Sequence, residues 1–105
     1  MGKSLMDFAA EARGHVEEVT TVQAAEMIAT SGDILVLDVR EPGEVAEGHL
    51  PQALNVPRGL IEAKADLAYP HREAKLADRH QPVIVYCASG VRSLLAASTL
   101  QQMGF

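Results

Sequence analysis

The sequence contains a single cysteine, Cys87, no tryptophan, and only two tyrosines and two phenylalanines among its 105 residues. One cysteine excludes an intrachain disulfide framework and any paired-cysteine zinc or redox motif. Positive charge is also scarce, since nine lysines and arginines stand against 14 aspartates and glutamates, for a formal net charge of −5. A chain without net positive charge does not favour nucleic acid or an anionic membrane as a partner.

Long hydrophobic runs are absent too. No stretch approaches the roughly 20 apolar residues that a membrane-spanning helix needs. The first eight residues mix one lysine with polar and acidic side chains and show no secretory signal. With 48% hydrophobic and 22% charged residues, the composition is that of a globular protein, and the length fits one small domain. We therefore expect a cytoplasmic, single-domain protein.

The chain divides at about residue 18. Residues 1–17 carry mixed charges with weak periodicity, and we interpret them as an N-terminal extension with one or two helical turns at most. The domain itself is expected to cover residues 18–105. Val19 is a short strand candidate, and Thr20 or Thr21 then caps a helix, with Gln23 completing a capping box. The segment 31–33, Ser-Gly-Asp, ends that helix.

Two unbroken apolar runs, residues 34–37 and 83–86, are typical of strands buried on both faces in a parallel sheet. A shorter strand is expected at 53–56. After the second run, a helix rich in small residues is expected up to Gly104, whereas the polar segment 63–81 predicts a solvated connection with a short helix. Alternating strands and helices predict an α/β fold with an open, mainly parallel sheet flanked by helices.

Cys87 stands where the second apolar run ends, and Ala88-Ser89-Gly90-Val91-Arg92-Ser93 leads from it into a helix. Ligands of open α/β sheets bind at the carboxyl ends of strands, beside helix N-termini. Small residues and Gly90 allow a tight loop whose N–H groups face one cup, and Arg92 can add a full positive charge. Such surroundings lower the pKa of a thiol and can hold an oxyanion or a persulfide.

A lone cysteine is more often a small buried hydrophobic residue than a nucleophile. The glycine-containing loop, the arginine and the helix start reverse that preference for Cys87.

A second group of residues follows the first strand. Asp38 ends that strand and is expected at the same sheet edge as Cys87, where it can brace the cysteine loop. Arg40 and Glu44 are four residues apart and can pair, although for Glu44 we favour a surface ion pair without a role in the site. Arg58 follows the third strand and is a candidate contact for a substrate anion, with a solvated arginine nearly as good an interpretation.

Together these residues resemble the rhodanese, or sulfurtransferase, domain. The resemblance rests on Asp38-Val39-Arg40-Glu41-Pro42, on Gly48-His49-Leu50-Pro51, on Ala53 to Pro57, and on the segment from Pro82 through Cys87 to Ser93. It covers roughly residues 19–105. Gln52 departs from the glycine usual at that position. The family pattern continues with one more strand and a helix after the segment that Phe105 ends here, so we expect a C-terminally truncated domain.

The resemblance implies a sulfurtransferase that works through a persulfide on Cys87. The thiolate takes the outer sulfur of a donor such as thiosulfate, and the loop amides hold the persulfide. Cyanide, a thiol or a protein sulfur acceptor then removes the sulfur, so ping-pong kinetics are expected and no cofactor is implied. The implied binding residues are Ala88, Ser89, Gly90, Val91, Arg92 and Arg58, with Asp38, Arg40 and Ser93 as loop support.

Two alternatives remain open. A phosphatase or arsenate reductase of the related type has five residues between its cysteine and arginine, whereas four separate Cys87 from Arg92. A non-catalytic docking or regulatory module of the same fold typically lacks the cysteine. The four histidines show no ligand spacing, so no metal is expected.

Overall fold

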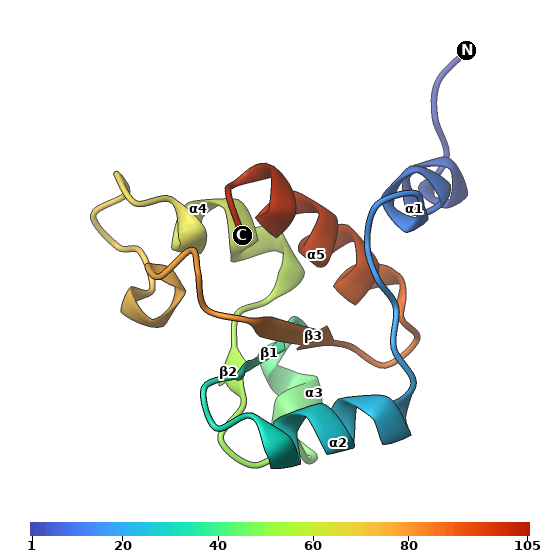
Figure 1. Cartoon of the computed structure of the whole chain (residues 1–105). Coiled ribbons are helices and arrows are strands. Elements are labelled where there is room, and N and C mark those ends of the chain that lie inside the picture. Colours follow the sequence, from blue (N-terminus) through green and yellow to red (C-terminus); the bar gives the residue numbers. More distant parts are fainter.

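A three-stranded parallel sheet with the order β2-β1-β3 organises the computed structural model, which describes residues 1–105. The elements in chain order are α1 (Leu5–Arg13), α2 (Thr21–Thr30), β1 (Leu35–Asp38), α3 (Pro42–Ala46), β2 (Leu54–Asn55), α4 (Ile61–Ala65), β3 (Val83–Tyr86) and α5 (Val91–Gln102). Single 3-10 turns occupy Arg58–Leu60 and Ala74–Leu76. Figure 1 shows α4 and α5 on one side of the sheet and α2 and α3 on the other. The predicted α/β class is confirmed.

The register of the sheet brings the carboxyl ends of β1 and β3 together. Leu35 pairs with Val83 at one end, and Asp38 pairs with Tyr86 at the other. β2 is shorter than expected, with two residues, and joins the opposite edge of β1. As a result Asp38 and Cys87, which directly follows Tyr86, lie at one edge of the sheet, as parallel strands require.

The core lies mainly between the sheet and the α4–α5 layer. Leu37, Ile61 and Leu76 are fully buried, and Ala96 and Leu100 of α5 close the cluster. Each fully buried leucine or isoleucine contributes about 1.5–3 kcal/mol of transfer free energy. No helix of the structure has the length and apolar character needed to cross a membrane.

The expectation of full burial on both faces holds for only one of the two apolar strands. In β1, Val36, Leu37 and Asp38 are buried, but all four residues of β3 are only partly buried. The reason is topological, because β3 pairs with β1 alone and its other edge has no neighbouring strand. That edge lines a groove of about 660 Å³ bordered by α5, by residues 16–19 and by Met27 of α2.

The N-terminal segment is more ordered than its sequence indicates. A capping box between Ser4 and Asp7 starts the nine-residue helix α1, whose buried Ala9 and Ala12 pack against Leu94 of α5. Figure 1 shows α1 beside α5. The prediction of a strand at Val19 is wrong, since that residue lies in the connection to α2.

The predicted capping box of α2 is confirmed. Thr20 Oγ1 accepts the Gln23 N–H, and Gln23 Oε1 accepts the Thr20 N–H. The predicted end of this helix before the segment 31–33 is confirmed as well.

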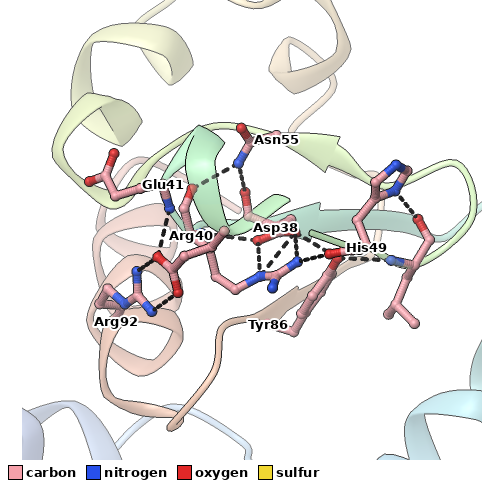
Figure 2. Close-up of polar contacts among 10 residues, drawn as sticks. Asp38, Arg40, Glu41, His49, Asn55, Tyr86 and Arg92 are labelled. Carbon is pink, nitrogen blue, oxygen red and sulfur yellow. Dashed lines mark hydrogen bonds and ion pairs between the residues drawn. The ribbon is translucent and has the colours of Figure 1, made fainter. Parts of the chain in front are cut away.

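The buried carboxylate of Asp38 connects the end of β1 to the loop that follows it and to Tyr86 of β3. It accepts the backbone N–H of Arg40 at 3.0 Å, the Arg40 guanidinium at 2.8–3.3 Å and the Tyr86 hydroxyl at 2.7 Å. Arg40 also donates to the Gly48 carbonyl, and the Tyr86 oxygen accepts the Leu50 N–H (Figure 2). Burial raises the pKa of Asp38, but the hydrogen bonds from Arg40 and Tyr86 outweigh it, and the pKa lies below its ordinary value.

Replacing Asp38 with alanine is expected to lower the free energy of unfolding by about 3 kcal/mol, because it leaves the Arg40 guanidinium and the Tyr86 hydroxyl without their acceptor. Urea denaturation measures this loss. Glu62→Ala, which removes an exposed partner of Arg58, is the control and is expected to cost less than about 1 kcal/mol. An equal loss of unfolding free energy in the two variants would contradict the stabilising role of the Asp38 carboxylate.

The same bonds predict a pH dependence. Because folding lowers the pKa of Asp38, its contribution is complete above the ordinary carboxyl pKa of about 4 and declines as the pH falls through the lower pKa of the folded state. The stability difference between wild type and Asp38→Ala is therefore expected to shrink in acid.

Candidate active site

The thiol of Cys87 sits in a cup formed by the loop between β3 and α5. Its Sγ accepts the backbone N–H of Gly90 at 3.0 Å and that of Ser93 at 3.4 Å. The Ser93 hydroxyl oxygen lies 3.3 Å from the same sulfur and 3.1 Å from the Gly90 carbonyl oxygen. Cys87 is half-buried and unpaired with any other cysteine. Three polar groups of the chain thus converge on one accessible sulfur.

Gly90 makes this convergence possible. It is the N-cap residue of α5 and has a φ of 93°, a left-handed conformation that favours glycine. Most N-cap residues supply a side-chain oxygen that accepts the N–H three residues later, and glycine has none. Here Sγ of Cys87 accepts that N–H, from Ser93. The sulfur therefore occupies the capping position at the positive end of a helix dipole.

The surroundings of the sulfur favour its ionised form. Burial raises the pKa of the Cys87 thiol, but the Ser93 hydroxyl and the backbone N–H groups of Ser93, Gly90 and Ser89 outweigh burial, and the pKa lies below its ordinary value. A lower pKa increases the thiolate fraction near neutral pH, and the thiolate is the nucleophilic form of cysteine.

The rest of the cup is lined by backbone. The N–H groups of Ala88, Val91 and Arg92 make no hydrogen bond to a backbone or side-chain acceptor of the chain. Val91 and Arg92 form the first turn of α5, where N–H groups have no partner within the helix. The loop can therefore bind a further electron-rich atom next to Sγ without breaking an existing bond.

Arg92, expected to assist the sulfur electrostatically, is held by Glu44. Its Nη1 and Nη2 donate to the two Glu44 carboxylate oxygens at 2.6 and 2.9 Å. Figure 2 shows the Arg92 guanidinium and the Glu41 backbone N–H meeting at this carboxylate. These bonds, with that from Arg92 the stronger, lower the pKa of Glu44 to about 2. Glu44 thus forms an ion pair at the surface, as expected, but its partner is Arg92 and not Arg40.

The other arginines are directed elsewhere. Arg40 does not pair with Glu44 as its spacing allows, because its guanidinium binds Asp38. Arg58 donates to Glu62 at 2.9 Å and to Thr99 Oγ1 at 3.2 Å, and it makes no hydrogen bond with the cysteine loop. The structure thus brings Asp38, Arg40 and the Cys87 loop together and leaves Arg58 outside.

Two contributors escaped the sequence analysis. Tyr86 connects Asp38 to the residue before Cys87, and Glu44 fixes Arg92. Both contacts join residues 48 positions apart, so neither leaves a periodic or local signal. The one available signal was the position of Tyr86 directly before Cys87, where its hydroxyl needs a partner on burial.

Comparison with known proteins assigns the family. A family model described as the rhodanese-like domain matches residues 20–105. The chain belongs to the rhodanese-like domain family. α1 lies before the matched region, and every residue of the cysteine loop and of the Asp38 network lies within it.

Named relatives of this rhodanese-like domain include sulfurtransferases. A sulfurtransferase of Allochromatium vinosum is 33% identical over 90 residues, which cover 86% of this chain and 76% of the relative. A thiosulfate sulfurtransferase of Coxiella burnetii is 28% identical over 89 residues, covering 85% and 74% of the two chains. These relatives support sulfur transfer as the general activity.

One similar solved structure carries a different description. It is a protein of unknown function from Rhodopseudomonas palustris, described as a possible tyrosine phosphatase. Its TM-score is 0.91 at 29% identity, and the match covers 99% of this chain and 80% of that chain.

Ser93→Ala is expected to raise the pKa of Cys87, because the variant removes a hydroxyl beside the thiolate. At neutral pH the thiolate fraction falls, so alkylation by iodoacetamide slows, and the pH profile of alkylation moves to higher pH. Ser89→Ala is the matched control, because Ser89 acts through its backbone N–H, which the variant keeps. An unchanged profile for Ser93→Ala would refute a role for this hydroxyl.

Proposed function

We propose that this rhodanese-like domain transfers a sulfane sulfur through a persulfide on Cys87. The observation that carries the proposal is the position of Sγ, which accepts two backbone N–H groups at the start of α5 and lies beside a serine hydroxyl. This arrangement stabilises a thiolate, and the loop offers further free N–H groups beside it. The sulfurtransferase names of relatives support the same chemistry.

The first half-reaction loads the cysteine. The Cys87 thiolate attacks the outer sulfur of a donor such as thiosulfate, a new S–S bond forms, and the S–S bond of the donor breaks. Sulfite leaves with the electron pair of that bond, and the terminal sulfur of the persulfide carries the negative charge. We assign to the free N–H groups of Val91 and Arg92, in the first turn of α5, the role of donating hydrogen bonds to that terminal sulfur.

The second half-reaction unloads it. A nucleophile such as cyanide or a thiolate attacks the terminal sulfur, the S–S bond of the persulfide breaks, and the Cys87 thiolate is restored. These 105 residues contain no second cysteine that could attack the persulfide, so the acceptor comes from outside them. Two half-reactions through a covalent intermediate predict ping-pong kinetics.

Phosphoryl transfer ranks below this proposal. A phosphatase loop must surround a tetrahedral anion, and its arginine must reach the anion with both donor groups. In this chain only four residues separate Cys87 from Arg92, and both Nη atoms of Arg92 are bound to Glu44.

Incubation with thiosulfate is expected to add one sulfur atom to the intact protein, as measured by mass spectrometry, and cyanide is expected to remove it. Cys87→Ser should gain no sulfur, because a hydroxyl at that position is not ionised at neutral pH. Circular dichroism establishes that both proteins are folded. Absence of the adduct on folded, reduced wild-type protein, with thiosulfate and with an alternative sulfane donor, would overturn the proposal.

A further inference from the structure

The charged side chains of the two segments that follow β1 and β3 do not form a net cationic group. Three carboxylates, from Asp38, Glu41 and Glu44, stand against the two guanidinium groups of Arg40 and Arg92. Arg40 is bound to the buried Asp38, so its charge is neutralised within the fold. Arg92 is therefore the one cationic side chain of this set that a bound donor could reach.

Glu44 binds both Nη atoms of that side chain. Both carboxylate oxygens bind Arg92, and one of them also accepts the Glu41 N–H at 3.0 Å, which fixes the carboxylate in position. Glu44 is also the third residue of the helix α3, whose first turn favours a negative charge. The Glu44 and Arg92 side chains are 37% and 34% exposed, so a donor can reach the pair from solvent.

Building on the proposed sulfur transfer, we propose that Glu44 is a specificity-determining residue that sets the charge of the preferred sulfur donor. By neutralising Arg92, it removes the cation that would bind a dianion such as thiosulfate. The cup is then left with backbone N–H groups, which bind sulfur but do not balance two negative charges. The geometry favours donors that carry one negative charge or none near the sulfane sulfur, such as the persulfide of a thiol.

The chemical step is the same for every donor. With benzenethiosulfonate, a monoanion, the Cys87 thiolate attacks the outer sulfur, the donor S–S bond breaks and benzenesulfinate leaves. With thiosulfate the leaving group is sulfite. Because one thiolate attacks both donors, the ratio of their second-order rate constants cancels any change in the pKa or nucleophilicity of Cys87. That ratio reports the charge of the site alone.

Glu44→Gln is the deciding variant, because glutamine can still accept the Glu41 N–H but carries no charge. An unbalanced Arg92 should accelerate loading by about threefold for benzenethiosulfonate and, since the Coulomb term doubles with donor charge, about tenfold for thiosulfate. The rate ratio of thiosulfate to benzenethiosulfonate thus rises about threefold. Intact-mass kinetics of persulfide formation measure both rates, and added salt should reduce the effect.

Two further variants complete the experiment. Glu11→Gln breaks another exposed ion pair, with Lys3, and is expected to leave the ratio unchanged. Arg92→Gln leaves the Glu44 charge unbalanced and should lower the ratio about threefold, which provides an independent test if Glu44→Gln does not fold.

The outcomes separate the two proposals. A raised ratio in Glu44→Gln and a lowered ratio in Arg92→Gln support the role of Glu44. An unchanged ratio in both variants, with Cys87 loading normally, overturns that role and leaves sulfur transfer intact. Failure of both donors to load folded wild-type protein overturns the proposed function itself.

Discussion

The buried carboxylate of Asp38 is the interaction on which the site depends. Asp38 is the last residue of β1, and its carboxylate accepts hydrogen bonds from the Arg40 guanidinium and the Tyr86 hydroxyl. The same guanidinium also donates to the Gly48 carbonyl. One buried charge thus fixes the loop after β1 and the last residue of β3 in a single arrangement. A buried carboxylate is tolerated only when its oxygens are fully hydrogen-bonded, so each of these partners is also constrained by it. Fixing Tyr86 also fixes the position of Cys87, because Cys87 directly follows Tyr86 in the chain.

Within that frame, the chemistry of the sulfur comes from the backbone more than from charged side chains. Gly90 turns the chain so that its own N–H and that of Ser93 reach Sγ, and the start of α5 adds its dipole. The one nearby cation, Arg92, is balanced by Glu44. Dipoles fixed in the fold stabilise a thiolate without attracting every anion in solution. Our proposals therefore assign nucleophilicity and charge selectivity to different residues.

The sequence was most informative where its signals are local. The capping box of α2, the buried run that forms β1, and the glycine and helix start after Cys87 all operate within a few residues, and the structure contains each of them. The partners of the charged residues could not be predicted, because the spacing that allows Arg40 to pair with Glu44 carries no information about Asp38 or Arg92. The partial exposure of β3 is likewise a property of sheet topology, which a hydrophobic run does not encode.

The separation of residues along the chain also determines the order in which the site can assemble during folding. The contacts of Sγ with Gly90 and Ser93 span at most six residues, whereas Asp38–Tyr86 and Glu44–Arg92 each span 48. Closing a loop of that length costs about 3 kcal/mol of chain entropy before either contact stabilises the fold. One loop closure brings both pairs together, because the two pairs enclose nearly the same segment of the chain, residues 38–86 and 44–92. The sulfur cup is thus a local product of α5 formation, and the charge balance around it arises only with the long-range closure that builds the sheet.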